Sequence, residues 1–394
     1  LKPYIDKVVK GEKNILWPGQ PLYFAKTSGT TSGAKYIPIT KESIKTHVNS
    51  ARDALLNYFL KTKNYKAING KHMFLQGSPK LEKKNGIYIG RLSGISAHYI
   101  PKLFLNNRKP SWNTNCIEDW EEKVETIIKE TVGEKMTIIA GIPSWVQMYF
   151  EKIVSNENKS IKEVFPELSL YVYGGVSYDP YKSTFDKLFG KKVDTLATFP
   201  ASEGFFGYQD TFTDENTDLL LLLNNDIFYE FIKAEDFLKG KYERITLKDV
   251  QVNVNYLLII STSAGLWGYN IGDTVKFTST RPYRIIVSGR IKHFLSAFGE
   301  HVIAEEVENS MKIATKDHGV TIREFTVAPN INPKEGLPCH EWYIEFETQP
   351  KDIIAFSKTL ETEMLNQNIY YRDLIRVAII KHLEVISVKK GGFN

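Results

Sequence analysis

The sequence predicts an α/β protein with two domains: a large N-terminal domain of mixed sheets flanked by helices, and a smaller α+β C-terminal domain. Two observations support this. In the first 290 residues, short β-prone runs alternate with amphipathic segments, which is the pattern of an α/β domain. After residue 290 the order changes to helix, two strands and helix, over roughly 100 residues. We therefore predict domains at residues 1–290 and 291–394.

Helices are predicted where apolar residues recur at steps of three and four. The clearest follows Thr40, a good N-cap residue. Its apolar stripe consists of Ile44, Val48, Ala51, Leu55 and Phe59, and we interpret it as core packing only. Further helices are predicted at residues 3–10, 117–130, 145–154, 179–189, 302–314 and 353–365.

Strands are predicted from short runs rich in β-branched and aromatic residues. In the N-terminal domain these runs lie at residues 36–39, 73–75, 136–140, 170–173, 193–198, 219–223, 228–232, 256–261 and 285–290. The C-terminal domain has two more, at residues 325–328 and 342–346. Open α/β sheets bind ligands at the carboxyl ends of their strands, so the residues that follow these runs are the first places to look for a site.

The composition excludes several classes of protein. With 394 residues, 42% of them hydrophobic, the chain can bury a sizeable core. A net charge of +5, dispersed along the chain, argues against nucleic acid as a partner. No apolar run approaches the roughly 20 residues of a membrane helix. Cys116 and Cys339 lack metal or disulfide spacing, which predicts a reducing, cytoplasmic setting. No feature demands more than a monomer.

The stretch from Thr27 to Lys35 reads Thr-Ser-Gly-Thr-Thr-Ser-Gly-Ala-Lys. Glycines let backbone N–H groups approach an anion, hydroxyls add donors and lysine adds positive charge, so the stretch predicts a phosphate-binding loop. It is not a Walker loop, because three residues separate Gly29 from Gly33 and Tyr36 follows Lys35. The alternative is a polar hairpin that only turns the chain.

Two further motifs follow predicted strands. Gly174 and Gly175 end the strand at 170–173, where a flat ligand ring could lie against the backbone. Phe199 follows the strand at 193–198 and is soon followed by Ser202 and Glu203. An aromatic ring, a hydroxyl and a carboxylate in that order suit stacking on a base and binding a magnesium–phosphate group.

Three more polar residues are candidates for binding. Asp273 follows Gly272 and could accept the two hydroxyls of a ribose, although a Gly-Asp pair is more often a turn. Arg290 ends a strand at Ser288-Gly289-Arg290. Arg91 lies in a Gly- and Ser-rich stretch, where it could hold a carboxylate or simply cap a helix, and we leave it out of the predicted site. The scattered histidines and cysteines predict no fixed transition metal.

These motifs occur in the order that is typical of the adenylate-forming superfamily, which includes acyl-CoA synthetases, peptide-synthetase adenylation domains and luciferases. Within it the chain resembles the auxin-responsive acyl-acid amido synthetases, particularly their bacterial relatives. These enzymes join jasmonate, auxin or benzoates to amino acids. The residues that carry the closer likeness are Pro3-Tyr4-Ile5, the loop with Ile37-Pro38-Ile39-Thr40, Ala201 to Gly204, Phe228 to Phe231, Ala264 to Tyr269, and Ser296 to Val302.

The resemblance implies a two-step ligase that uses ATP and Mg²⁺. A carboxylic acid becomes an acyl-adenylate, and an amine, expected to be that of an amino acid, then displaces AMP. It also implies a rotation of the small domain about a hinge near Ile291 and Lys292 between the two steps. The alternatives are an acyl-CoA ligase, which would consume coenzyme A instead, and a catalytically silent nucleotide-binding protein.

The resemblance also assigns roles to residues. Lys35 and Glu203 would be catalytic, and Glu203 would bind Mg²⁺ together with Ser202. Asp273 would bind the ribose, and Arg290 would contact the nucleotide. The other residues expected to bind the nucleotide are Thr27, Ser28, Gly29, Thr30, Thr31, Gly33, Gly174, Gly175, Val176, Ser177, Phe199, Ala201 and Tyr269.

The sequence departs from the family pattern at two of these motifs. Phe199 stands where the family usually has tyrosine, which keeps an aromatic face and loses a hydroxyl. Asn270 stands where the plant enzymes have arginine, so any salt link there is lost. The chain starts at Leu1, inside the family's first helical region, and stops before the late lysine-bearing segment of many members. We therefore expect it to be a fragment of a longer product.

Overall fold

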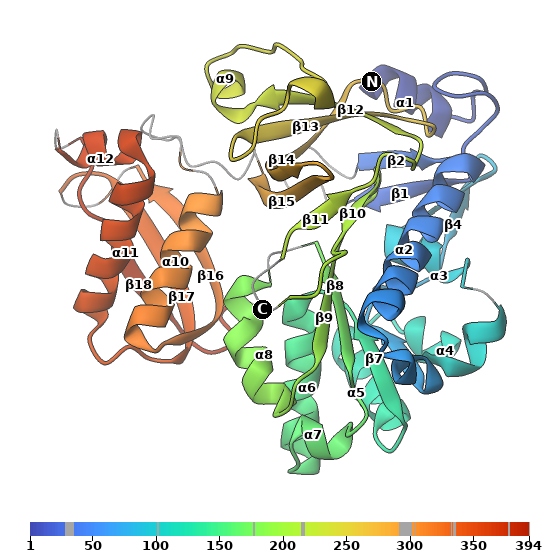
Figure 1. Ribbon diagram of the computed structural model, residues 1–394, viewed down its shortest axis with the longest axis horizontal. Helices are drawn as coiled ribbons and strands as arrows, with labels where there is room; N and C mark the ends of the chain where they lie inside the picture. The colour runs from blue at the N-terminus through green and yellow to red at the C-terminus, as the bar shows by residue number, and fades with distance from the viewer. Residues whose placement is uncertain are drawn as a thin grey trace.

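The computed structural model describes residues 1–27, 35–100, 102–175, 178–213, 217–290, 302, 304–331, 333, 336–376 and 379–393. Within these residues the strands form a four-stranded, an eleven-stranded and a three-stranded sheet. The first two belong to the larger part of the molecule and the third to the smaller part, which lies to one side (Figure 1). The α/β prediction, with a smaller C-terminal unit, is confirmed.

The eleven-stranded sheet is half parallel and half antiparallel. Its parallel half consists of β6 (Arg108–Lys109), β3 (Lys71–Phe74), β7 (Met136–Ala140), β8 (Leu170–Gly174) and β9 (Asp194–Ala201). The antiparallel half continues through β10 (Gly204–Tyr208), β11 (Leu219–Leu221), β15 (Tyr283–Arg290), β14 (Tyr269–Thr280), β13 (Asn255–Thr262) and β12 (Ile227–Lys233). The direction therefore changes at the β9–β10 hairpin, which sequence analysis did not predict.

The four-stranded sheet has the order β2 (Lys35–Ile39), β1 (Tyr23–Thr27), β5 (Ile87–Gly90) and β4 (Glu82–Lys84). It lies beside the antiparallel half, near α1 (Lys2–Val9) (Figure 1). The Gly- and Ser-rich stretch around Arg91 forms β5 followed by α3 (Leu92–Ala97). Arg91 is the N-cap residue of that helix.

Helices pack on the parallel half of the sheet. They are α2 (Lys41–Thr62), α4 (Trp112–Asn115), α5 (Trp120–Thr131), α6 (Pro143–Glu157), α7 (Ile161–Val164) and α8 (Lys182–Phe189), with α9 (Ala234–Leu238) on the antiparallel half. Short 3-10 turns occur at η1 (Tyr65–Asn69), η2 (Lys102–Asn107), η3 (Asp179–Tyr181) and η4 (Leu247–Asp249). Aromatic rings fill the core between β8 and the helices α6 and α8: the rings of Tyr171 and Phe185 stack at 5.0 Å between centroids.

Helix α2 begins as predicted, and most of its apolar stripe packs in the core. Thr40 forms a capping box with Ser43, whose backbone N–H donates to the Thr40 hydroxyl at 3.2 Å. Ile44 and Phe59 are buried. Val48 and Leu55 are partly buried and pack against core clusters, so the interpretation as core packing holds for four of the five stripe residues. Ala51 is exposed and borders a cleft.

The smaller part has its own core. It comprises α10 (Ala304–His318), β16 (Thr321–Asn330), β17 (Cys339–Thr348), α11 (Ile353–Gln367), α12 (Ile369–Arg376) and β18 (Glu384–Val388). Trp342, Phe356 and Leu360 are fully buried between the sheet and the helices. Sequence analysis did not predict α12 and β18. Within the described ranges, every helix is too short or too polar to cross a membrane.

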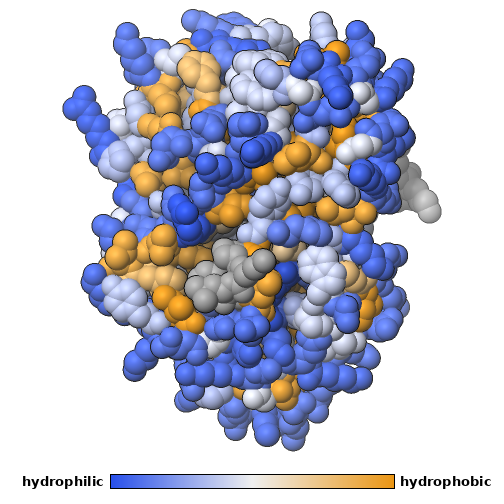
Figure 2. Space-filling model, turned by 90° about the vertical axis from the view of Figure 1, so that its right-hand side faces the viewer, coloured by the Kyte–Doolittle hydropathy of each residue, from blue (hydrophilic) through white to orange (hydrophobic). Residues whose placement is uncertain are grey.

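Apolar side chains gather across the middle of the face shown in Figure 2, with hydrophilic residues above and below them. Large apolar side chains exposed in the large part include Leu56 and Leu60 on α2 and Phe74 at the end of β3. Leu56 and Phe74 also line the cleft, so part of the exposed apolar surface belongs to the cleft wall.

Candidate active site

A cleft of about 3030 Å³ opens at the carboxyl ends of β3, β7, β8 and β9. Its walls come from α2 and α3 on one side and from β14, β15 and α10 on the other. Single small-molecule sites usually enclose roughly 300–1,000 Å³, so this cleft has room for more than one ligand. Its position at the ends of the parallel strands is where open α/β sheets bind their ligands.

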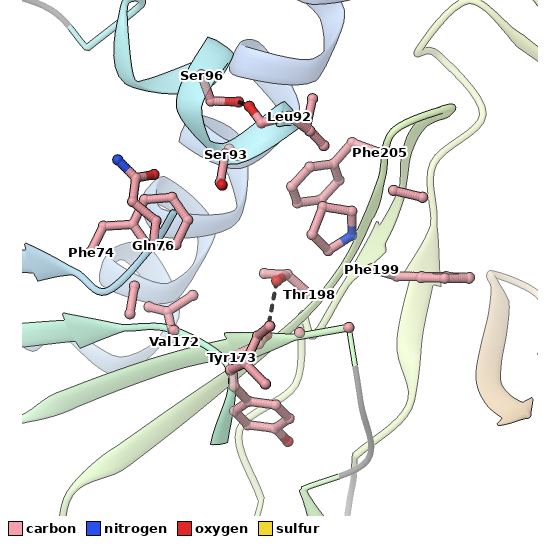
Figure 3. A pocket seen from close by; sticks show the side chains of 18 of the residues that line it. Phe74, Gln76, Leu92, Ser93, Ser96, Val172, Tyr173, Thr198, Phe199 and Phe205 are labelled. Atoms are coloured by element: carbon pink, nitrogen blue, oxygen red, sulfur yellow. Dashed lines mark hydrogen bonds between the residues drawn. The ribbon is translucent and has the colours of Figure 1, made fainter. Parts of the chain in front are cut away.

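The end of β8 brings backbone to the surface of the cleft. Gly174 pairs with Thr198 on β9, and the Thr198 hydroxyl donates to the carbonyl of Tyr173 at 2.9 Å (Figure 3). Gly175 has φ +86, with no atom within 4 Å of the place a Cβ would take. A flat ligand could therefore lie directly on this backbone. Val176 and Ser177 lie outside the described residues.

Replacing Gly174 with alanine is expected to weaken nucleotide binding and destabilise the protein. A Cβ there would lie 2.6 Å from the Thr198 carbonyl oxygen and 2.8 Å from its hydroxyl. Since both atoms belong to the neighbouring strand, β8 must move, and overpacking of this kind costs about 1–3 kcal/mol. Titration of the variant with ATP, together with urea unfolding, checks this. Gly133→Ala is the control. Gly133 has φ +86, so alanine is strained there, but the position is far from the cleft and ATP binding should be unchanged.

Ser202 and Glu203 form the turn of the β9–β10 hairpin, closed by the pairing of Ala201 with Gly204. Both turn residues line the cleft and are partly exposed. Phe199 also borders the cleft, but only 5% of its surface is exposed. Its ring packs edge-to-face on Phe206 at 5.0 Å between centroids. Burial of the Phe199 ring leaves little free face for stacking on a base.

The glycine-rich stretch connects β1 to β2, and Thr27 pairs with Lys35 across that hairpin. Lys35 is exposed and lines the cleft, as does Lys26 on β1. Ser28, Gly29, Thr30, Thr31 and Gly33 lie outside the described residues, as does the side chain of Thr27. The described part places one lysine at each base of the hairpin.

Asp273 lies within strand β14 and not in a turn. Gly272 before it has φ +87, and its N–H donates to Asn270 Oδ1 at 2.7 Å. Asn270, which stands where the plant enzymes have arginine, therefore shapes the backbone next to Asp273. The backbone of Asp273 pairs with that of Arg290, whose side chain lies outside the described residues. Tyr269 begins the same strand and packs against the core.

The other side of the cleft is largely apolar. Its wall includes Phe74 on β3, Leu92 on α3, Val172 on β8 and Phe205 on β10, which surround the pocket in Figure 3. Leu55 and Phe59 of α2 extend this wall. Polar side chains lie at one edge: Gln76, Ser93 and Ser96 (Figure 3), together with the cations Arg91, Arg108 and Lys123. The arrangement suits an acid with an apolar body.

Arg91 and His47 are among the cleft residues that were left out of the predicted site. Arg91 lines the cleft, and its side chain passes 3.1 Å from the place a Cβ on Gly77 would take. The Gly- and Ser-rich stretch around it was the available signal. His47 of α2 lines the cleft edge-on to Phe205, with 5.5 Å between ring centroids. The sequence held no signal for His47, because a lone histidine on a helix is typical of many structural positions.

Burial lowers the pKa of His47 from 6.5 to about 4, which makes stability depend on pH. Between these values the unfolded chain binds a proton that the folded protein does not. The free energy of unfolding is therefore highest above pH 6.5. It falls by about 2–3 kcal/mol as the pH falls from 6.5 towards 4. In His47→Phe, urea unfolding should show that much less acid destabilisation. An equal loss in both proteins would contradict the assignment.

Models of known protein families match three parts of this chain. Residues 1–108 match the GH3 family N-terminal domain, residues 220–290 the GH3 family central domain, and residues 305–394 the GH3 family C-terminal domain. The three matches follow the chain in order and together cover more than half of it. The chain belongs to the GH3 family. The resemblance drawn from the motifs is thereby confirmed.

Two curated relatives from this family carry names that state a reaction. The jasmonoyl–L-amino acid synthetase JAR4 of Nicotiana attenuata is 22% identical, over 100% of this chain and 79% of the relative. The indole-3-acetic acid-amido synthetase GH3.3 of Arabidopsis thaliana is 23% identical, over 50% of this chain and 34% of the relative.

Solved structures share the fold. The GH3.15 acyl acid amido synthetase superposes with a TM-score of 0.78 at 16% identity, over 99% of this chain and 78% of that one. A 2-hydroxyisobutyryl-CoA ligase, solved in a postadenylation state with an acyl-AMP, gives a TM-score of 0.56 at 11% identity, over 93% and 70%. The GH3-family chain therefore has the fold of adenylate-forming ligases.

Proposed function

We propose that this GH3-family chain activates a carboxylic acid with ATP as an acyl-adenylate and then transfers the acyl group to the amine of an amino acid. The observation that carries the proposal is that all five sequence motifs contribute described residues to one cleft. These are Lys35, Gly174-Gly175, Phe199 to Glu203, Asn270 to Asp273, and Ser288-Gly289. The relatives named as amido synthetases support the reaction class.

The nucleotide side of the cleft would be built from four parts of the chain. Gly174 and Gly175 offer bare backbone to the adenine, and Asp273 offers a carboxylate to the ribose hydroxyls. The side chain of Asp273 is largely buried, which favours a ligand that reaches it from within the cleft. Lys35 and the hairpin before it would hold the triphosphate. Arg290 would contact the nucleotide from the end of β15.

The residues present fit a magnesium–nucleotide complex. No group of three or more His, Cys, Asp or Glu side chains that could hold a metal occurs among the described residues. Mg²⁺ is commonly bound through one or two carboxylates plus phosphate oxygens and water, so Glu203 with Ser202 is a sufficient donor set. Bound there, the ion would neutralise charge on the phosphates during transfer.

The two steps follow from this placement. A carboxylate oxygen of the acid bonds to the α-phosphorus of ATP as the bond to pyrophosphate breaks. The amine then bonds to the acyl carbon and loses a proton, while the bond to AMP breaks. The apolar wall holds the acid body, and donors such as Lys35 stabilise the charge that develops on the phosphates. We expect the protein to act on these small molecules as a cytoplasmic monomer.

Acid-dependent exchange of labelled pyrophosphate into ATP tests the first step. Aromatic, fatty and jasmonate-like acids would be supplied with Mg²⁺. Exchange with any of them supports adenylate formation and identifies the acid class. Amino acids and coenzyme A are then offered separately, with AMP release measured. Release with coenzyme A alone would favour the acyl-CoA ligase. ATP binding without exchange for any acid would favour a silent nucleotide-binding protein.

A further inference from the structure

The two parts of the molecule meet through polar side chains. Gln147 on α6 donates from Nε2 to Glu347 on β17 at 2.7 Å and to Glu151 on its own helix at 2.9 Å. Arg323 on β16 forms an ion pair with Glu151. We call the following set the interdomain cluster: Gln147, Glu151, Thr184, Arg323, Glu345 and Glu347. It lies where β16 and β17 face α6 and α8 (Figure 1).

Acidic groups outnumber basic ones in this cluster. Arg323 pairs with Glu151 and, at 3.5 Å, with Glu345. Glu345 is held further by the backbone N–H of Gly391 at 2.9 Å. Glu347 receives only neutral donors among the described residues, Gln147 and, at 3.3 Å, the hydroxyl of Thr184. The guanidinium of Arg323 is therefore the cation beside three carboxyl groups, those of Glu151, Glu345 and Glu347.

The carboxyl groups of Glu151 and Glu347 both accept from the same amide nitrogen, Gln147 Nε2, at 2.9 and 2.7 Å, so their oxygens lie near each other. Two carboxyl groups can form a hydrogen bond only if one of them holds a proton. Burial, and next the hydrogen bond to Glu151, raise the pKa of Glu347, whereas Arg323 and Thr184 oppose this. Gln147 Oε1 is buried and finds no donor among the described residues. A carboxyl proton would supply a donor to this acceptor-rich site.

Other charged groups at the same interface do not neutralise the pair. Glu324 of β16 is also buried enough to raise its pKa, and Glu345 adds to the effect. Glu324 and Glu308 both lie near the phenol of Tyr181, which belongs to η3. The ion pair of Lys312 with Asp179, at 2.8 Å, satisfies both of its members on η3 and α10. Of the charged groups at this interface, Arg323 is the cation that lowers the pKa of Glu347, and it is already paired with Glu151 and Glu345.

The position of the small part matters for the cleft. Glu308 and Asn309 on α10 line it together with Gly175, Asp179 and Ser288. Contacts that hold the small part against α6 and α8 therefore also hold α10 at the nucleotide side. We propose that the interdomain cluster is a proton-dependent latch: a proton shared by Glu151 and Glu347 holds the small part in this position, and loss of the proton releases it.

The direction of the pH dependence follows from proton binding. While the small part is held against α6 and α8, Glu347 keeps its proton at a pH where a solvated glutamate has lost it. The latch is therefore complete below the pKa of a solvated glutamate. It weakens as the pH rises through the raised pKa of Glu347. Gln147, Glu151 and Glu347 act on the cleft through the position of α10, so they are positioning residues. The latch goes beyond the proposed function and holds whether or not the chain is an amido synthetase.

Interdomain distance measurement tests the latch without any substrate. Lys187 on α8 and Lys358 on α11 are exposed and would be changed to cysteine for a dye or spin-label pair, in a Cys116→Ser background. At about pH 4.5, near the ordinary pKa of glutamate, we expect one narrow distance distribution. At about pH 8.5 it should broaden towards other distances. A distribution that does not change over this range would overturn the proposal.

Two variants separate the latch from a general pH effect. Glu347→Gln carries a permanent donor in place of the proton, so its distribution should stay narrow at both pH values. Glu341→Gln is the control: Glu341 lies on the same strand, and among the described residues its carboxylate accepts hydrogen bonds from Asn330 and Tyr343 of the small part. It should behave like the parent protein. A Glu347→Gln variant that still broadens at high pH while keeping its circular dichroism would also overturn the latch.

Discussion

Replacing Glu203 with glutamine is expected to lower acid-dependent pyrophosphate exchange by about 10²–10³-fold, the usual loss when one preorganised electrostatic group is removed. Glutamine keeps the shape of the side chain in the β9–β10 turn and removes the negative charge. If Glu203 holds Mg²⁺ against the phosphates, the missing charge should weaken metal binding. Exchange measured over a range of Mg²⁺ concentrations should then show partial recovery as the ion is raised.

The control is Glu243→Gln, which removes an exposed carboxylate from the same part of the chain. It should exchange pyrophosphate at the parent rate. Thermal unfolding must be unchanged in both variants, because the Glu203 side chain is only partly buried in its turn. Full exchange activity in Glu203→Gln at low Mg²⁺ would remove Glu203 from the metal site and leave the adenylation proposal to be tested on Lys35.

Replacing Arg284 with methionine is expected to destabilise the large part by about 3 kcal/mol, at the low end for breaking a buried ion pair. Arg284 on β15 binds Asp210 after β10 through both guanidinium ends, one of them at 2.8 Å, and lies 3.4 Å from Asp218. Its side chain is only 15% exposed. These contacts join β15 to both ends of the segment that connects β10 to β11. Urea unfolding followed by tryptophan fluorescence measures the loss.

A triple variant distinguishes a charge effect from lost packing. With Arg284→Met combined with Asp210→Asn and Asp218→Asn, no carboxylate remains without its cation. Replacing all members of a buried ion cluster is often nearly neutral, so most of the lost stability should return. If the triple variant is as unstable as Arg284→Met alone, the arginine contributes through packing and not through charge.

Local patterns in the sequence determined the elements and the order of the motifs. The Thr40 cap, the strand at 136–140 and the glycine pair after residue 173 depend on neighbouring residues only, so they can be inferred without the fold. The order of the five motifs along the chain was enough to indicate the family. Pairing between distant strands was not predictable in this way, and the β9–β10 hairpin, where the eleven-stranded sheet changes direction, was missed.

Tertiary structure alone decided how the candidate residues are used. The ring of Phe199 borders the cleft and is largely buried against Phe206 of β10, so stacking on a base stays a prediction. Within the apolar stripe of α2, Ala51 is exposed at the cleft, which its place in the pattern did not reveal. His47 and the interdomain cluster arise from side chains on separate elements. Their burial and mutual contacts are properties of packing, which no local pattern of residues encodes.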